Sequence, residues 1–436
     1  MMTSVDRSGE DEALALEHVA AAEQASRMPP EIDLALARPV ERVAIVGGGL
    51  MGAGIAAACL RAELSVTLIE RDEKAADEAA TRIAGLLDGA VKRGKMTVEE
   101  RREQLARLTT AESTVQTASA DLAIEAVFEN LDAKRAVFQK LAAVLGADIP
   151  IATNTSYLDP SAIAEETKNP GRILGLHFFS PAHIMKLLEV VKTPTTSGET
   201  LATAFAFAKK LDKVAVLSGV CDGFIGNRML QAYRRQADYM LIGGCLPHEI
   251  DQAMRAFGMP MGPYELQDLT GLQIGYANRQ RLAATRDPQE RYVDIGDRLC
   301  EAGRLGQRTG KGWYRYQEGD RTPHRDGEVE RLIEETSARS GLERRAFSAG
   351  CIQDRLLAAL INEGGHILDE GIAARSGDVD LVKIHGYGFP RSRGGPMYYA
   401  ECRGRSAILA AMRDVAAESP NSWRISRYLE AVAPQV

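Results

Sequence analysis

The stretch "RVAIVGGGLMGAGIAAACL", Arg42 to Leu60, constrains the fold more than any other part of the chain. An apolar run leads into glycines at GxGxxG spacing, and an Ala-rich, helix-favouring run follows. In this context the first glycine permits a tight turn, the second lets the backbone approach a pyrophosphate, and the third allows close helix–strand packing. The sequence therefore predicts a strand–loop–helix unit that binds a dinucleotide. The loop residues predicted to bind it are Gly47, Gly49, Leu50, Met51 and Gly52.

A carboxylate at the end of the second apolar run indicates which dinucleotide binds. Glu70 lies 18 residues past Gly52, where it would accept hydrogen bonds from the ribose hydroxyls of NAD. Arg71, its neighbour, leaves NADP as an alternative. The carboxylate would repel a 2′-phosphate, however, so NAD is the expected cofactor.

Short apolar runs alternate with helical patterns such as Asp132 to Leu145. Buried strands that alternate with helices predict a parallel sheet covered on both faces, and hence a Rossmann-type α/β domain. After about Ser218 the strand signal fades and helical patterns dominate. The predicted strands are Val43–Val46, Val66–Ile69, Leu122–Val127, Ile149–Ala152 and Ile173–Phe178.

The helical part contains one internal repeat. "FIGNRMLQAYRRQADYMLIGG" from Phe224 resembles "CIQDRLLAALINEGGHILDEG" from Cys351. Each is followed by a glycine–proline turn, "FGMPMGPYE" from Phe257 and "YGFPRSRGGPMYYAE" from Tyr387. We expect a duplicated all-α domain whose two copies pack on each other. The predicted boundaries are 1–40 for an N-terminal helix and linker, 41–218 for the Rossmann-type domain, 219–316 and 346–436 for the helical copies, and 317–345 for a charged connector.

Composition excludes several classes of function. The net charge of -7 gives no basic field for nucleic acid, and no apolar run is long enough to span a membrane. The stretch Met1 to Glu10 is too polar for a signal peptide, and Pro434–Val436 is not a peroxisomal address. The six cysteines form no CxxC pair, which suits a reducing compartment. A cytoplasmic enzyme is the expectation.

Polar residues follow the fourth and fifth predicted strands. "IATNTSYL" places Asn154 and Ser156 at the carboxyl edge of the sheet, where open α/β folds bind ligands. Ser156 could instead cap the next helix, although Asp159 could also take that role. Asn227, at the start of the first repeat helix, is a further polar candidate.

"GLHFFSPAHIMKLLEVV", Gly175 to Val191, contains two histidines among apolar residues. An isolated histidine on an apolar strand is more often a core residue, but a buried Glu189 needs a partner because an unpaired buried carboxylate is very unfavourable. Two strands joined by the "SPAHIMK" turn could bring His177 and Glu189 together as a base and its orienting carboxylate. His183 is expected to lie in the turn without a catalytic role.

These motifs together resemble the 3-hydroxyacyl-CoA dehydrogenase family. The resemblance covers roughly Arg42 to Tyr316 through "GGGLMGAGIA", "NTSYL", "HFFSPAHIMKLLEVV", "GFIGNR", "FGMPMGPYEL" and "GQRTGKGWY". The repeat makes the chain similar to the dehydrogenase half of multifunctional fatty-acid β-oxidation enzymes. That resemblance implies a monomer with an internal pseudo-dimer, and a hydratase or thiolase as a possible partner. Hydration is not expected from this chain.

The resemblance also implies roles for individual residues. The family's catalytic histidine and glutamate fall on His177 and Glu189, and the groups that hold the acyl-CoA substrate fall on Ser156 and Asn227. Glu129 matches a recurrent family position and would support the site. The second repeat is expected to be structural. Beyond the loop, the residues assigned to the cofactor are Glu70, Glu129 and Asn154. Lys92 and Lys95 are assigned to the CoA phosphates, and the alternative is that they are solvated charges at an exposed helix end.

Two other functions stay open at this point. One is a dehydrogenase of a 3-hydroxy acid that is not a CoA ester, which the repeat disfavours. The other is a non-catalytic scaffold subunit for a hydratase, which the intact set of polar site residues disfavours.

Overall fold

The computed structural model describes residues 9–431. Residues 1–8 of the polar N-terminal stretch and the predicted non-peroxisomal end, Pro434–Val436, lie outside the described residues. The chain folds into two compact units. The sheet unit comprises residues 17–227 and 370–387, and the helical unit comprises, within the described chain, residues 9–16, 228–369 and 388–431.

The sheet unit is built on one eight-stranded sheet with the order β3-β2-β1-β4-β5-β6-β7-β8. Neighbouring strands from β3 to β6 in this order pair in parallel. Strands β6 and β7 pair antiparallel, and β7 and β8 pair in parallel. The strands are β1 Arg42–Val46, β2 Ser65–Ile69, β3 Leu108–Ala111, β4 Leu122–Glu125, β5 Ile151–Thr153, β6 Ile173–Phe178, β7 Leu187–Lys192 and β8 Val214–Ser218.

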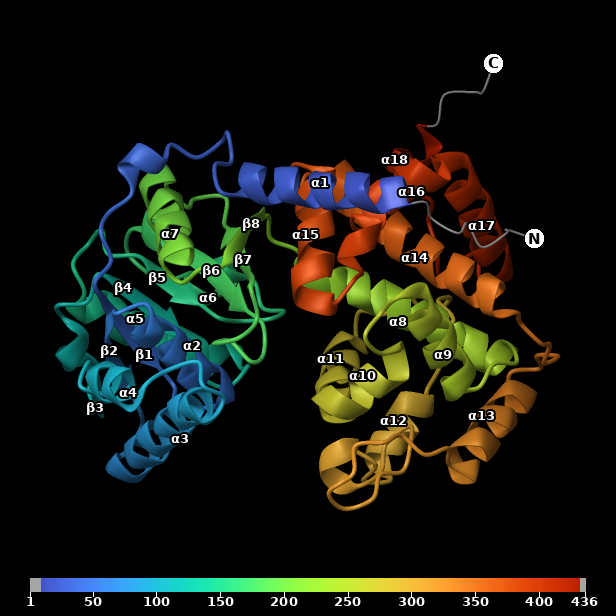
Figure 1. The fold of residues 1–436 in the computed structure, drawn as a ribbon, viewed down its shortest axis with the longest axis horizontal. Helices are drawn as coiled ribbons and strands as arrows, with labels where there is room; N and C mark the ends of the chain where they lie inside the picture. Colours follow the sequence, from blue (N-terminus) through green and yellow to red (C-terminus); the bar gives the residue numbers. More distant parts are fainter. Residues whose placement is uncertain (1–8, 432–436) are drawn as a thin grey trace. The chain divides into compact units, whose positions relative to one another are not determined.

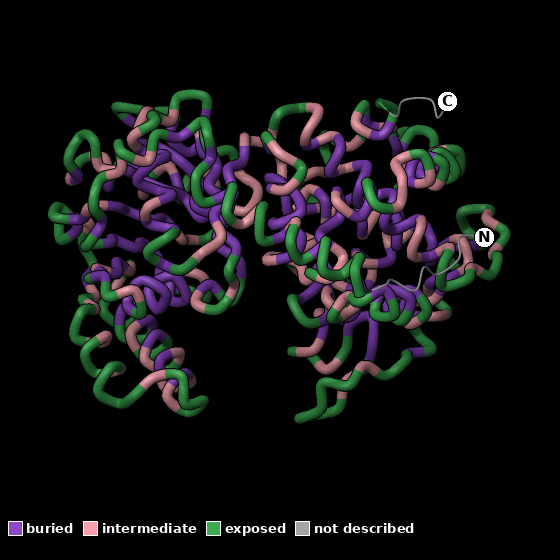
Figure 2. Tube along the Cα trace, turned by 45° about the horizontal axis from the view of Figure 1, so that its top comes forward, coloured by how far each residue is buried: buried purple, intermediate pink, exposed green. Residues whose placement is uncertain are grey.

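Helices cover both faces of this sheet (Figure 1). One core cluster joins the strands to α2, α3 and α7, and another joins them to α5 and α6. Apart from β3 at the edge of the sheet, the strands are accordingly buried along most of their length, and buried residues dominate the interior of the sheet unit (Figure 2). The helices between the strands are α2 Leu50–Arg61, α3 Glu73–Lys92, α4 Val98–Leu105, α5 Leu131–Val144, α6 Pro160–Ile163 and α7 Gly198–Lys210.

The Rossmann-type sheet is therefore as predicted, but the sheet is mixed rather than wholly parallel. The short connection between β6 and β7 has no crossover helix, and a connection of this kind joins antiparallel strands. The prediction also missed β8 and missed β3, in which only Leu108 and Ala111 are apolar.

The helical unit is centred on α14, which contacts α9, α16, α17 and α18. The expected connector 317–345 contains α13, and Val329 and Ile333 of that helix are buried. None of the described helices is long and apolar enough to cross a membrane. The helices of this part of the chain are α8 Gly226–Gly243, α9 Pro247–Phe257, α10 Pro263–Thr270, α11 Leu272–Leu282, α12 Ile295–Glu301, α13 Gly327–Arg339, α14 Ala349–Asp369, α16 Pro396–Arg403, α17 Arg405–Glu418 and α18 Arg427–Glu430.

One helix from the C-terminal part of the chain belongs to the sheet unit. Helix α15, Ser376–Tyr387, packs against β7 and β8, although the predicted boundary placed it in the second helical domain. The second half of α1, Gly9–Ser26, lies alongside it: His18 Nε2 is 2.9 Å from Asp380 Oδ2, and His385 Nε2 is 2.8 Å from Glu23 Oε1.

Candidate functional site

The glycine-rich loop between β1 and α2 has the geometry that its spacing predicts. Gly47 has φ +99°, and a Cβ there would lie 2.8 Å from the carbonyl oxygen of Ala126. A Cβ on Gly52 would lie 1.8 Å from the carbonyl oxygen of Gly47, whereas a Cβ on Gly49 would meet nothing within 4 Å. The loop is therefore closed at Gly47 against Ala126, just after β4, closed at Gly52 against Gly47, and open at Gly49.

The N-terminus of α2 is suited to an anion. No side chain caps this helix end at Gly49, and the side chain of Leu50 is 70% exposed beside it. Met51 is half-buried and packs against the core. Unpaired N–H groups at the positive end of a helix bind phosphate, so the loop fits the pyrophosphate of a dinucleotide.

Glu70, directly after β2, faces this loop. Its Oε1 accepts a hydrogen bond from the Gly48 N–H at 2.6 Å, and its Oε2 accepts one from the Arg71 N–H at 3.1 Å. The guanidinium of Arg71 pairs with Asp72 at 2.9 Å. The Glu70 carboxylate is thus fixed next to the glycine-rich loop. Arg71, the cation that would favour a 2′-phosphate, forms an ion pair with Asp72.

Replacing Gly52 by alanine is expected to weaken NADH binding by about tenfold or more, because overpacking of this size costs about 1–3 kcal/mol. The new methyl group would force α2 away from the loop. Fluorescence titration with NADH measures the effect. Gly85→Ala on α3 is the matched control, since a Cβ there meets nothing within 4 Å. Equal affinity of the two variants would contradict the account of the loop.

Behind the ends of β4 and β5 lies a buried ionic network that the sequence did not indicate. Lys134 Nζ, on α5, lies 2.8 Å from Glu125 Oε1 and 3.2 Å from Glu129 Oε2. Lys134 is 1% exposed and Glu125 is fully buried. Thr153 Oγ1 and the Val127 N–H also donate to the Glu125 carboxylate, each at 2.7 Å.

Glu129 connects this network to the turn that carries Ser156. Its Oε1 accepts hydrogen bonds from Thr155 Oγ1 at 2.5 Å, from the Ser156 N–H at 2.9 Å and from the Tyr157 N–H at 3.2 Å. Burial alone would raise the pKa of the Glu129 carboxyl, but the charge of Lys134 and these hydrogen bonds outweigh it, so the pKa lies below its ordinary value. Glu129 is therefore a charged anchor of the turn, and its assignment to the cofactor stays a prediction.

Asn154 and Ser156 differ in their hydrogen bonds to the rest of the protein. Asn154 Oδ1 accepts a hydrogen bond from the Phe178 N–H at 2.9 Å, which ties the end of β5 to the end of β6. Ser156 is half-buried, and no hydrogen bond of its hydroxyl to another described residue is found. Asp159, not Ser156, caps α6 by accepting from the Ser161 N–H. Ser156 lies at the carboxyl edge of the sheet, and its assignment to the substrate stays a prediction.

His177 and Glu189 face each other across the antiparallel pair β6–β7, where their Cα atoms are register partners. His177 Nδ1 lies 2.6 Å from Glu189 Oε2, and both residues are buried. A carboxylate only accepts, so the proton of this bond resides on Nδ1 and Nε2 is the basic nitrogen. Glu189 Oε1 accepts the Gly226 N–H at 3.0 Å, so both carboxylate oxygens are satisfied.

The imidazole of His177 is also held by aromatic rings. Phe179 and Phe224 lie with ring centroids 4.5 Å and 5.7 Å from it. With one nitrogen fixed by Glu189 and two tilted aromatic rings packed beside the imidazole, His177 has the tautomer and orientation that a general base requires.

His183 lies in the turn between β6 and β7 and has a different environment. Burial and then the charges of Arg61, Lys213 and Arg93 lower its pKa. Arg61 Nη1 donates to its backbone carbonyl at 3.0 Å. A histidine among cations with no carboxylate to orient it is not placed to work as the base.

Asn227, the second residue of α8, is half-buried and lies next to Gly226, whose N–H binds Glu189. Its Oδ1 accepts a hydrogen bond from Tyr387 Oη at 2.9 Å. The backbone contact through Gly226 places Asn227 near the His177–Glu189 pair.

The two lysines predicted to bind CoA phosphates, Lys92 and Lys95, lie at the end of α3 and just after it. Both lysines are exposed. In the part of the chain that the structure describes, no hydrogen bond or ion pair links either of them to the site residues. Their assignment to CoA stays a prediction.

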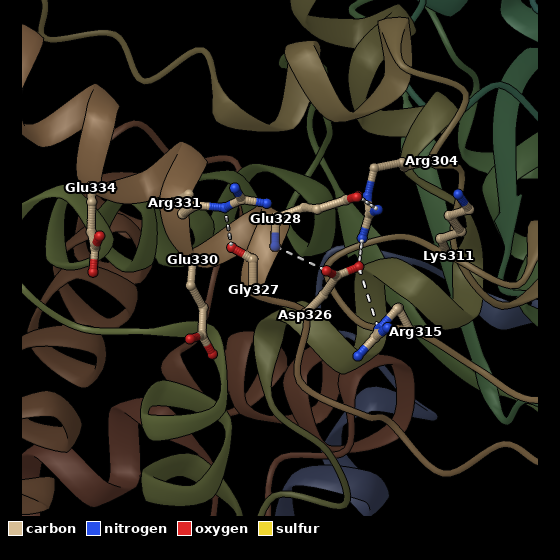
Figure 3. A pocket seen from close by; sticks show the side chains of 9 residues that line it. All are labelled: Arg304, Lys311, Arg315, Asp326, Gly327, Glu328, Glu330, Arg331 and Glu334. Carbon is tan, nitrogen blue, oxygen red and sulfur yellow. Dashed lines mark hydrogen bonds and ion pairs between the residues drawn. The ribbon is translucent and has the colours of Figure 1, made fainter.

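A pocket of about 650 Å³ in the helical unit contains none of the predicted site residues (Figure 3). Two of its basic groups face Asp326: Arg304 pairs with it at 2.5 Å and Arg315 lies 3.8 Å from it. Because these charges neutralise one another within the protein, we interpret the pocket as a structural ion-pair network.

Sequence reasoning missed Lys134, and one signal could have found it. Lys134, Phe138 and Leu141 recur at helical spacing, and all three are buried on one face of α5. A lysine on the apolar stripe of a helix requires a buried carboxylate as its partner. No comparable local pattern brings Tyr387 to Asn227, because the two are 160 residues apart.

The comparisons with known proteins agree with this geometry. Residues 42–221 match the profile of the 3-hydroxyacyl-CoA dehydrogenase NAD binding domain, and residues 223–316 match that of the family's C-terminal domain. The peroxisomal bifunctional enzymes of Cavia porcellus and Homo sapiens are each 38% identical over 415 residues, or 92% of this chain. The chain spans 57% of the length of each of these two relatives.

Two solved structures extend the likeness. The 3-hydroxybutyryl-CoA dehydrogenase of Escherichia coli is 27% identical with a TM-score of 0.78, and the match covers 90% of this chain and 98% of that one. The (S)-3-hydroxybutyryl-CoA dehydrogenase of Ralstonia eutropha is 31% identical with a TM-score of 0.59, covering 64% of this chain and 100% of that one. The matched NAD binding domain supports NAD as the cofactor. The chain belongs to the 3-hydroxyacyl-CoA dehydrogenase family.

Proposed function

We propose that the chain is an NAD-dependent (S)-3-hydroxyacyl-CoA dehydrogenase, which interconverts 3-hydroxyacyl-CoA and 3-ketoacyl-CoA in fatty-acid β-oxidation or a related acyl-CoA pathway. The observation that carries the proposal is the buried His177–Glu189 pair, 2.6 Å apart on the sheet whose other half forms the dinucleotide loop. Membership of the family and the names of its relatives support the substrate class.

The residues divide the work of alcohol oxidation. His177 Nε2 takes the proton of the 3-hydroxyl, and Glu189 stabilises the imidazolium that forms. Bound NAD supplies the hydride acceptor for the hydrogen on C3. Ser156 and Asn227 orient the oxygens of the substrate through their hydroxyl and amide groups. In the reverse direction the imidazolium returns the proton to the 3-keto oxygen.

The decrease of absorbance at 340 nm with NADH and acetoacetyl-CoA tests this function. We expect oxidation of NADH with the thioester, and much slower oxidation of NADPH because Glu70 repels a 2′-phosphate. Free acetoacetate is the matched control, since a dehydrogenase of non-CoA 3-hydroxy acids would reduce it equally well. Absence of oxidation with acetoacetyl-CoA and with longer 3-ketoacyl-CoAs would refute the proposal and favour a scaffold subunit.

We further propose that the helical part is duplicated, as the repeat predicts. Helices α8, α9 and α10 correspond in order to α14, α15 and α16. Gly258 and Gly388 both have positive φ directly after α9 and α15, and Pro263 and Pro396 both begin the next helix. The domain boundaries predicted from the sequence follow this duplication, except that α15 is grouped with the sheet unit.

The assembly and the compartment stay predictions. The sequence indicates a monomer, with a hydratase or thiolase as a possible partner. The two bifunctional enzymes are named as peroxisomal, so the comparisons do not support the cytoplasmic location that the sequence indicated. Fractionation of the source cells would decide the compartment.

A further inference from the structure

We infer that Tyr387, from the second repeat, is a positioning residue for the substrate-holding amide of Asn227. This inference rests on the proposed dehydrogenase function and concerns the same site. It departs from the expectation that the second repeat is only structural. The first repeat has Phe257 at the matching position, so the hydroxyl is particular to the second copy.

The hydrogen bond itself defines which way the amide of Asn227 faces. Tyr387 Oη donates to Asn227 Oδ1 at 2.9 Å. An asparagine amide carries an acceptor on one side and two donor hydrogens on the other. With the oxygen bound to Tyr387, the Nδ2 donors point away from Tyr387. They are then available to the thioester carbonyl oxygen of the substrate, which can only accept.

The ring of Tyr387 is linked to the His177–Glu189 pair through Phe179. It contacts Phe179 edge-on, with ring centroids 5.5 Å apart, and Phe179 in turn lies 4.5 Å from His177. A Cβ on Gly226 would lie 2.5 Å from the Tyr387 ring, and the Gly226 N–H is the donor to Glu189. The absence of a side chain at Gly226 thus lets the ring reach the site.

Several contacts within the sheet unit hold Tyr387 in this place. Lys383 Nζ lies 3.7 Å from the centroid of its ring, and Lys383 is 2% exposed. One residue earlier, a Cβ on Gly386 would lie 2.6 Å from the side chain of Leu187 on β7. The Gly219 N–H, just after β8, donates to the Ile372 carbonyl at 2.7 Å.

Helix α1 supports α15 from its other side. Besides the two histidine–carboxylate pairs, Arg375 Nη1 donates to the Ala25 carbonyl at 3.0 Å. The Tyr387 hydroxyl is therefore presented to Asn227 by a helix with fixed partners along its length. A positioning role requires such rigidity, because an amide is oriented only as well as the group that binds it.

A double-mutant cycle on Tyr387 and Asn227 tests the inference. Tyr387→Phe keeps the ring and removes only the hydrogen bond, so kcat/KM for acetoacetyl-CoA is expected to fall about three- to tenfold, with the affinity for NADH unchanged. In the Asn227→Ala background the same substitution is expected to change kcat/KM less than about twofold, because no amide is left to orient. A purely structural hydroxyl would give the same factor in both backgrounds.

Two further variants keep the test decisive. Asn227→Asp retains an acceptor for Tyr387 but loses the Nδ2 donors, so it is expected to lose as much kcat/KM as Asn227→Ala. Tyr239→Phe is the matched control, since it removes a buried hydroxyl that bonds to Ser422 Oγ at 2.9 Å within the helical unit. It is expected to leave kcat/KM within about twofold of the wild type.

The outcomes separate the inference from the proposed function. Three results in an active wild-type protein would overturn the positioning role alone. They are an unchanged kcat/KM in Tyr387→Phe, the same fold-change for this substitution in both backgrounds, and full activity of Asn227→Asp. An inactive wild type would overturn the proposed function, and the inference with it.

Discussion

His177→Ala is expected to lower kcat for acetoacetyl-CoA reduction by about 10²- to 10⁴-fold, the usual contribution of a positioned general base. Glu189 Oε2 and the rings of Phe179 and Phe224 hold the imidazole in one orientation. The substitution leaves the glycine-rich loop and Glu70 intact, so the affinity for NADH should be unchanged. Steady-state kinetics and NADH titration together measure the two quantities.

His183→Ala is the matched control for this prediction. His183 lies in the turn that follows the strand of His177, and its pKa is lowered by burial and by neighbouring cations. The variant is expected to keep kcat within about twofold of the wild type. A large loss in His183→Ala with little loss in His177→Ala would show that the wrong histidine has been assigned.

Lys134→Met is expected to destabilise the protein by about 3–5 kcal/mol, because it leaves the fully buried Glu125 carboxylate without its cation. The same change removes the charge beside Glu129, which holds the turn of Ser156 through three hydrogen bonds. Urea unfolding measures the free energy of unfolding, and kcat/KM should fall with it.

Lys140→Met, on the same helix, is the control. Lys140 is exposed, so its replacement should change the free energy of unfolding by less than about 0.5 kcal/mol. Adding Glu125→Leu to Lys134→Met should recover part of the loss, because the pair is then replaced by apolar groups. Equal stability of the two lysine variants would contradict the ionic network.

Local patterns were sufficient to predict the parts of the fold that local residues determine. The GxGxxG loop, the strand after it and the alternation of apolar runs with helices predicted the Rossmann-type sheet, because each depends on residues adjacent in the chain. The turn between β6 and β7 is short enough that the pairing of His177 with Glu189 could also be expected from burial alone.

Features that depend on distant residues could not be predicted in this way. The hydroxyl of Tyr387 binds Asn227, which is 160 residues away in the sequence. Helix α15 packs on β7 and β8, although the sequence predicted it in the second helical domain. Nothing in the local sequence specifies that α15, rather than another helix of the C-terminal part of the chain, packs on the sheet. The positions of β7 and β8 in the sheet depend in the same way on packing between elements that are distant in the sequence, such as α15.

Single-turnover hydride transfer tests the central claim most directly. The protein loaded with one equivalent of NADH is mixed with excess acetoacetyl-CoA, and the absorbance at 340 nm is followed in the wild type and in His177→Ala. The account predicts full oxidation of the bound NADH in the wild type and a rate about 10²- to 10⁴-fold lower in the variant. No oxidation in the wild type, or equal rates in the two proteins, would contradict it.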